Sequence, residues 1–311
     1  MLAGERAMLS DDMTRFVDLH RGLGFKFRTQ HGLLRSFVAF AEAHGDAFIR
    51  GDRVLDWASQ APSPPQRRNR LVMIRRFALA LRAEDIRHEV PGADALGHAT
   101  FRRRTPHIYA PDEIIRLLGA AAALLPAGSI RPLTYATLFG LLAATGMRIS
   151  EALAIRLDDI TADGLVIRQT KFQKSRLLPL HNTTSRALNQ YLSMRAQLQT
   201  AADTLFVSAK GNVLSYNTVK AIFLRLARSV GLRGEPGQRG PRIHDLRHTF
   251  AVRSLERCSN DANAVARHLV ALTTYLGHAH VTDTYWYLQA TPILMAQIAA
   301  VSETVHRGSA P

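Results

Sequence analysis

His244-Asp245-Leu246-Arg247-His248 is the stretch of this sequence that says most about its fold and its chemistry. His244 and His248 are one helical turn apart and Arg247 follows His244 by three residues, so on a helix the three side chains crowd one side. A planar guanidinium can donate paired hydrogen bonds to phosphate oxygens, and an imidazole can transfer a proton near neutral pH. The stretch therefore predicts a helix that carries a phosphate-handling site.

Two more segments supply groups of the same kind. The run T-G-M-R-I-S-E (residues 145–151) predicts a turn that brings Arg148 to the start of a helix, with Glu151 three residues on and able to hold the guanidinium. Near the carboxyl end, Y-W-Y (residues 285–287) offers a phenol that can attack phosphorus. Tyr285 and Tyr287 would point about 200° apart on a helix, so only one can enter the site, and spacing alone leaves the choice open.

A metal site is a competing interpretation of the two histidines. The H-x-x-x-H spacing can bind zinc, but the metalloprotease pattern needs a glutamate after the first histidine, and Asp245 stands there. Arg247 between the histidines disfavours a cation. Cys258 is the single cysteine, which excludes an intramolecular disulfide and a cysteine zinc cluster. We expect no metal and no cofactor.

The charge of the chain indicates its partner. Its 40 Lys and Arg against 25 Asp and Glu give a formal charge of +15, and an excess of this size favours a polyanion, most often nucleic acid. The longest apolar runs, such as Leu138 to Ala144, are too short to cross a bilayer, and the first residues do not resemble a signal peptide. We expect a cytoplasmic, nucleoid-associated protein with no membrane partner.

The length of 311 residues favours two domains. Apolar periodicity predicts four helices in residues 1–91, with Gly45 ending the second and Pro64-Pro65 opening the fourth. No acid lies between Gln66 and Ala83 on this fourth helix, which favours a DNA-facing surface over a merely solvated one. Its predicted DNA-binding residues are Arg67, Arg68, Arg70, Arg75 and Arg76.

Residues 92–108 form a basic linker in this interpretation. Proline and glycine interrupt regular structure there, and Arg102, Arg103 and Arg104 place three charges in a row. Such a linker can follow a phosphate backbone, or it can be a hinge without a specific contact.

Residues 109–311 are predicted to be mostly helical with a small antiparallel sheet. Leu133 to Ala144 is apolar nearly all round, so we expect it at the centre of a core. Two strands, Gly164–Ile167 and Arg176–Leu180, would flank a turn that holds Lys171 and Lys174. Further helices are expected from Pro111, over 150–157, and near 183–198, 215–230, 244–257, 262–275, 281–288 and 291–304.

Together these motifs resemble the tyrosine recombinases, or phage-integrase family, over residues 108–290. The shared pattern is the T-G-x-R-x-S-E run, a lysine in a β-turn, H-x-L-R-H, L-G-H and a tyrosine nine residues past that last histidine. The resemblance implies that Tyr287 forms a 3′-phosphotyrosyl bond. It further implies that Arg148, Arg247 and His278 bind the scissile phosphate, that Lys171 protonates the leaving 5′-oxygen and that His244 assists proton transfer.

The resemblance leaves some assignments open. Phe172-Gln173 replaces the glycine-rich turn common in the family, so Lys174 is an alternative to Lys171, and the stretch from Cys258 to Tyr275 is longer than in compact members. The family implies a two-domain clamp on double-stranded DNA and a homo-oligomer, a tetramer in the synaptic complex. The last helix would dock on a neighbouring protomer or pack on its own domain.

Other functions remain open from the sequence. A type IB-like topoisomerase uses the same attack without a second duplex, and a DNA-binding architectural protein would retain the fold without the reaction. We favour a recombinase that serves a mobile element, such as a phage or a transposon, or one that resolves chromosomes or plasmids. Without an added arm-binding domain, we expect a simple recombinase rather than one that needs large bridged complexes.

Overall fold

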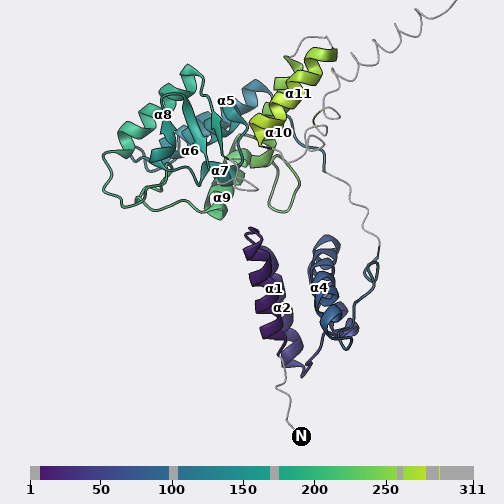
Figure 1. Ribbon diagram of the computed structural model, residues 1–311. Coiled ribbons are helices and arrows are strands. Elements are labelled where there is room, and N and C mark those ends of the chain that lie inside the picture. Colours follow the sequence, from purple (N-terminus) through teal and green to yellow (C-terminus); the bar gives the residue numbers. More distant parts are fainter. Residues whose placement is uncertain (1–7, 98–103, 169–174, 258–261, 278–286, 288–311) are drawn as a thin grey trace, which may run out of the picture. The chain divides into compact units, whose positions relative to one another are not determined.

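The computed structural model describes residues 8–97, 104–168, 175–257, 262–277 and 287 of the 311-residue chain. The chain divides into two compact units, Met1–Arg103 and Arg104–Pro311. Helices dominate both units, and the sheet has three strands, all antiparallel (Figure 1). The expected mainly helical fold with a small antiparallel sheet is confirmed.

Over residues 8–97, four helices build the first unit, as the periodicity predicted. They are α1 (Leu9–Gly22), α2 (Arg28–Ala43), α3 (Gly51–Ser59) and α4 (Pro64–Glu84). Their apolar faces meet in one core that includes Phe37, Trp57 and Phe77, because side chains three and four residues apart share a helix face. Gly45 has a φ of 78° just past the end of α2, a conformation that favours glycine after a helix.

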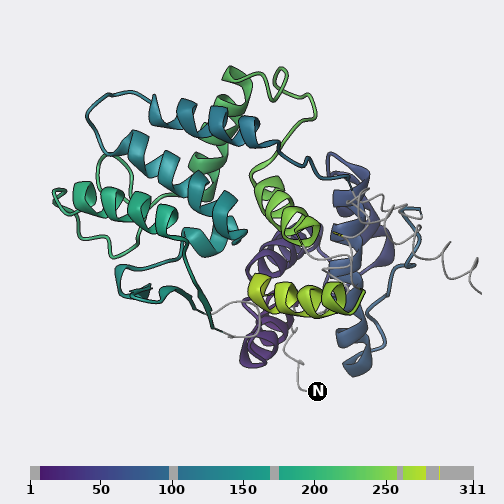
Figure 2. The same cartoon turned by 90° about the horizontal axis from the view of Figure 1, so that it is seen from above.

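Helix α6 (Arg131–Thr145) is central to the second unit. It packs against α5 (Pro111–Ala122), α8 (Asn182–Arg195) and α10 (Ile243–Glu256), and Leu138 and Phe139 on it are fully buried. The prediction of a central apolar helix is confirmed. Helix α9 (Tyr216–Ser229) packs on α5, and α11 (Ala262–Leu276) packs on α10 (Figure 2). Of the two helices expected after residue 280, only Tyr287 lies within the described residues.

The sheet carries the strands that were expected and one that was not. β2 (Gly164–Ile167) pairs with β3 (Arg176–Leu178), as predicted, and the unpredicted β1 (Ile160–Thr161) pairs with β2 on its other side. The register sets Ile167 opposite Arg176. A Cβ at Gly164 would lie 2.2 Å from the Leu178 carbonyl oxygen, so this close approach requires glycine.

The predicted helix over residues 150–157 is confirmed at its start and is wrong in its length. Helix α7 covers only Ile149–Ala152, and a 3₁₀ turn, η1 (Leu157–Asp159), follows. The chain between them makes backbone hydrogen bonds with a distant segment instead, since Leu157 donates to the Asp203 carbonyl and the Ile155 carbonyl accepts from Leu205. These long-range bonds compete with helix propagation, and the local apolar pattern does not contain them.

Within the described residues, no helix is long and apolar enough to cross a bilayer.

Candidate active site

Arg148 is the N-cap residue of α7, at the start of a helix as predicted. One terminal nitrogen of its guanidinium donates to Glu151 Oε1 at 2.8 Å and the other donates to the Gly277 carbonyl at 3.1 Å. The Arg148 backbone N–H also donates to Glu151 Oε2, at 3.0 Å. The side chain is 31% exposed, so this held cation still faces solvent.

Arg247 lies inside α10 and is 2% exposed. Its two terminal nitrogens donate to the carbonyls of Gly146 and Leu276, each at 2.8 Å. Burial lowers the pKa of the Arg247 guanidinium to about 10, although Tyr287 acts in the opposite direction. The group therefore remains a cation at neutral pH.

Helix ends hold both guanidinium groups. Gly146 is the C-cap of α6, and Leu276 and Gly277 stand at the carboxyl end of α11. The last carbonyls of a helix lack intrahelical donors and carry partial negative charge, so they are suitable anchors for arginine. Because Leu276 binds Arg247 and Gly277 binds Arg148, adjacent carbonyls set the two cations side by side.

Tyr287 contacts Arg247, the buried member of this pair of cations. Its side chain is 2% exposed and is hydrogen-bonded with the Arg247 guanidinium, and its ring centroid lies 5.4 Å from that of His248. By contrast, the phenol of Tyr109 donates to the Arg242 carbonyl and that of Tyr191 to the Leu205 carbonyl, within the hydrophobic core. Tyr285, the alternative phenol, lies outside the described residues.

The two histidines of α10 form a ring cluster with Tyr287. The centroids of His244 and His248 are 4.7 Å apart. Loss of water around its ring, together with the positive charge of Arg247, lowers the pKa of His244. Burial lowers the pKa of His248 to about 4. Both rings are therefore neutral at pH 7 and able to accept a proton.

Arg176 belongs to this cluster, although the sequence interpretation treated it only as the start of a strand. Its guanidinium donates to Glu151 Oε2 at 2.7 Å and to Oε1 at 3.2 Å, so one carboxylate holds two arginines. Burial by itself would raise the pKa of Glu151, but hydrogen bonds from Arg176 and Arg148 outweigh it and the pKa is lowered.

Strand alternation could have revealed Arg176. Residues two apart in a strand share a face, and Leu178 is fully buried. Arg176 therefore points inward, where a charge needs a partner of opposite sign.

Several predicted site residues lie outside the described part of the chain. They are Lys171, Lys174, His278, Arg102 and Arg103. Arg104 is described, and it donates to the Gly240 carbonyl at 2.6 Å. Among the described residues, no group of three His, Cys, Asp or Glu side chains could hold a metal ion.

The arginines of α4 differ in what they contact. The side chains of Arg67, Arg68, Arg70 and Arg75 donate to the carbonyls of Ala61, Gly97, Trp57 and Pro91, respectively. Arg70 also lies over the Trp57 ring, 4.7 Å from its centroid. Arg76 is exposed, as a residue that contacts DNA must be. Part of this basic helix therefore stabilises its own unit.

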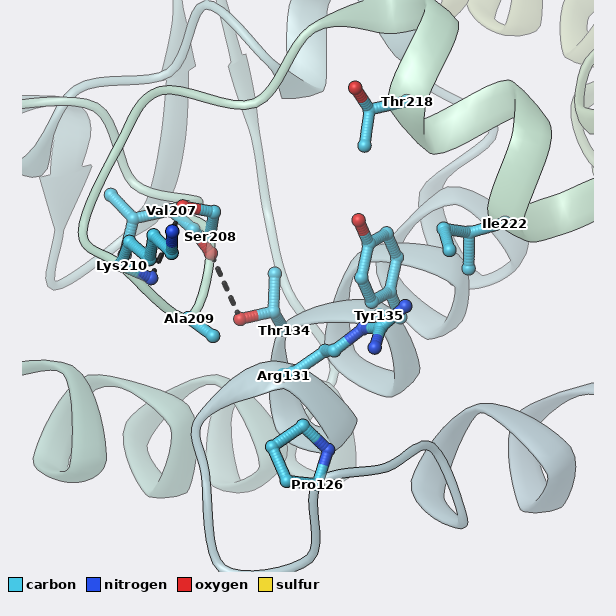
Figure 3. Close-up of a pocket in the computed structure, with 10 residues that line it drawn as sticks. All are labelled: Pro126, Arg131, Thr134, Tyr135, Val207, Ser208, Ala209, Lys210, Thr218 and Ile222. Carbon is cyan, nitrogen blue, oxygen red and sulfur yellow. Dashed lines mark hydrogen bonds between the residues drawn. The ribbon is translucent and has the colours of Figure 1, made fainter.

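A cavity of about 300 Å³ lies between the start of α6, residues 207–210 and α9 (Figure 3). Arg131 and Tyr135 line it from α6, and Lys210 and Thr218 line it from the other side. Gly146 stands just past the other end of the 15-residue α6, roughly 20 Å away at 1.5 Å per residue. The cavity is therefore separate from the cluster of Arg148, Arg247 and Tyr287.

Comparison with known proteins gives the same family as the motifs. Residues 109–292 match the phage integrase family. The chain belongs to this family. A relative from Sinorhizobium fredii, y4rB, described by name as an integrase/recombinase, is 41% identical over 91% of this chain and 93% of its own length. Tyrosine recombinase XerD of Mycobacterium tuberculosis is 31% identical over 82% of this chain and 78% of its own.

A solved structure shares the fold. The Tn1549 transposon integrase, in complex with transposon right end DNA, has a TM-score of 0.67 and 16% identity, covering 96% of this chain and all of that chain. The family resemblance drawn from the motifs is confirmed. The protein is a tyrosine recombinase, an enzyme of site-specific DNA cleavage and rejoining.

Proposed function

We propose that this recombinase cleaves duplex DNA with Tyr287 as its nucleophile. The proposal is carried by one observation: two helix C-termini hold Arg148 and Arg247 side by side, and Tyr287 is hydrogen-bonded with Arg247. Two fixed cations neutralise the non-bridging oxygens, which otherwise repel a nucleophile. The same positive field favours the phenolate form of Tyr287 over the weakly nucleophilic phenol.

The reaction exchanges one phosphodiester for another. The Tyr287 oxygen bonds to phosphorus, the bond from phosphorus to the 5′-oxygen breaks, and a 3′-phosphotyrosyl ester forms. The phenol proton passes to His244, and the leaving 5′-oxygen takes a proton from Lys171 or, in the alternative assignment, Lys174. His278 adds a contact to the phosphate. A free 5′-hydroxyl then attacks the ester and releases Tyr287, so neither a metal nor a nucleotide is needed.

The DNA clamp proposed here joins residues 1–91, as a helical core-binding domain, to residues 109–311, as the catalytic domain. Exposed Arg76 and the linker residues Arg102, Arg103 and Arg104 would contact phosphates. Arg67 is exposed as well, so it is available for the same task. Arg68, Arg70 and Arg75 are half-buried and each binds a carbonyl of its own unit, so they would add positive charge near the DNA rather than exposed donors.

Assembly of several copies follows from the stoichiometry of the reaction. Each protomer supplies one nucleophile and cuts one strand, whereas two duplexes present four strands. Exchange between two duplexes therefore needs four protomers, so we propose a homotetramer in the synaptic complex. We retain the proposal that the segment near residues 291–304 docks on a neighbouring protomer.

A suicide substrate tests the proposal. The probes are nicked duplexes tiled across the DNA that flanks the gene, because loss of the short fragment beside the nick prevents religation. The expected result is a covalent protein–DNA band on one or a few duplexes, which Tyr287→Phe abolishes and Tyr285→Phe retains.

A band that persists in Tyr287→Phe contradicts the assignment. Relaxation of supercoiled plasmid without a preferred site would favour the topoisomerase alternative. Specific DNA binding without any covalent band would favour an architectural protein.

A further inference from the structure

Glu151 connects Arg176 to the site described above. Its Oε1 accepts from Arg148 at 2.8 Å, and its Oε2 accepts from Arg176 at 2.7 Å. The Glu151 and Arg176 side chains are 8% and 12% exposed, whereas that of Arg148 is 31% exposed. The inner ion pair is thus shielded from water, and the outer cation faces the solvent from which DNA would come.

The turn at the end of α11 also contacts Arg176. A Cβ at Gly277 would lie 2.6 Å from an Arg176 terminal nitrogen, so the guanidinium packs directly on this glycine. The Gly277 carbonyl accepts from Arg148. Arg176 therefore contacts both groups that hold Arg148, namely a carboxylate and a helix end.

The charges of Arg148, Glu151 and Arg176 indicate why a second arginine matters here. A carboxylate that faced Arg148 alone would cancel most of its positive charge, and a neutral pair attracts a phosphate weakly. With Arg176 present, the three groups carry a net charge of +1, and the buried pair accounts for the carboxylate. An arginine here also has a cost, because its Nε is buried without a hydrogen-bond partner among the described residues.

We propose that Arg176 is a positioning residue that neutralises Glu151, so that Arg148 keeps its charge for the scissile phosphate. The inference rests on the proposed function, since it assigns a role within the same cleavage site. Arg176 acts through Glu151 and Arg148 and does not itself touch the reacting atoms.

Single-turnover cleavage of the nicked duplex tests this role. Arg176→Gln leaves Glu151 to pair with Arg148 alone, so cleavage at saturating protein should slow by about tenfold to 100-fold. The double variant Glu151→Gln/Arg176→Gln removes both inner charges and frees Arg148, so its rate should exceed that of the single variant. A purely structural role predicts the opposite order, because a second lost contact would add damage.

A neutral phosphate supplies the second readout. When a methyl group replaces one non-bridging oxygen of the scissile phosphate, the charge on Arg148 matters less. The Arg176→Gln defect should then shrink to less than about threefold. The matched control is Arg156→Gln, because Arg156 pairs with Asp203 at an exposed site and its loss should leave both rates unchanged.

Each outcome of these experiments supports or overturns the inference. Absence of a covalent adduct in the wild type would overturn the proposed function and this inference with it. Wild-type cleavage with an equal rate in Arg176→Gln, or a double variant slower than the single one, would overturn this inference alone. If Arg176→Gln does not fold, Arg176→Lys keeps the charge and should cleave within about tenfold of wild type. Greater loss in a folded Arg176→Lys would overturn the inference.

Discussion

Gly146→Ala tests how the site is anchored. Gly146 caps α6 with a φ of 61°, and its carbonyl accepts from Arg247 at 2.8 Å. A Cβ at this position would lie 2.4 Å from Cδ1 and 2.8 Å from Cγ of Phe250. Phe250 is itself stacked on Tyr275, with ring centroids 5.6 Å apart, so the ring cannot move without disturbing a second one.

The expected loss has two parts. A left-handed backbone costs an L-residue about 1–2 kcal/mol relative to glycine. Forcing a methyl group against the Phe250 ring costs about 1–3 kcal/mol more, the usual range for overpacking. The free energy of unfolding should therefore fall by about 2–5 kcal/mol, measured by urea denaturation with far-ultraviolet circular dichroism.

Substitutions at two other glycines of the same unit distinguish the backbone cost from the overpacking cost. Gly231 has a φ of 73° and nothing within 4 Å of an added Cβ, so Gly231→Ala should show the backbone cost alone. Gly119 lies within α5 with open space around it and an ordinary helical φ, so Gly119→Ala should raise stability by about 0.5–1 kcal/mol. A Gly146→Ala protein no less stable than Gly231→Ala would refute the reasoning.

Two further predictions concern pH and the arginines of α4. The pKa of His248 is about 4 in the folded protein and 6.5 ordinarily, so the unfolded chain binds the proton first and stability falls as pH drops from about 6.5 to 4. Between pH 7 and 4.5, the free energy of unfolding of His248→Asn should therefore fall by about 2–3 kcal/mol less than that of wild type in urea titrations. An equal fall in the two proteins would contradict this prediction. Arg70→Ala should destabilise the first unit by about 1–2 kcal/mol through its lost Trp57 contacts. Arg76→Ala should instead leave melting unchanged and reduce the salt dependence of DNA binding by about one ion in filter-binding titrations; the reverse pattern would show that the two roles are exchanged.

Periodic signals in the sequence predicted much of the fold. The helices of the first unit, the central α6 and the pairing of β2 with β3 all follow from residues that repeat with the period of a helix or a strand. Arg148 at the start of α7 and Glu151 one turn later follow from the same reasoning. These features depend on neighbours in the chain, which a sequence displays directly.

Long-range partners account for what the sequence did not predict. The chain leaves α7 early because Leu157 and Ile155 bind residues 203–205. Arg176 joins the site because β3 lies beside Glu151, which precedes it by 25 residues. Likewise, Arg70 binds a carbonyl 13 residues away, a contact that a row of arginines without nearby acids does not indicate.

Identifying the residue whose oxygen becomes linked to DNA tests the account most directly. The adduct formed on the nicked duplex would be digested with trypsin and nuclease, and the nucleotide-bearing peptide sequenced by tandem mass spectrometry. The account predicts a nucleotide on Tyr287, whose side chain is hydrogen-bonded with Arg247. A nucleotide on Tyr285 or on any other residue would contradict it.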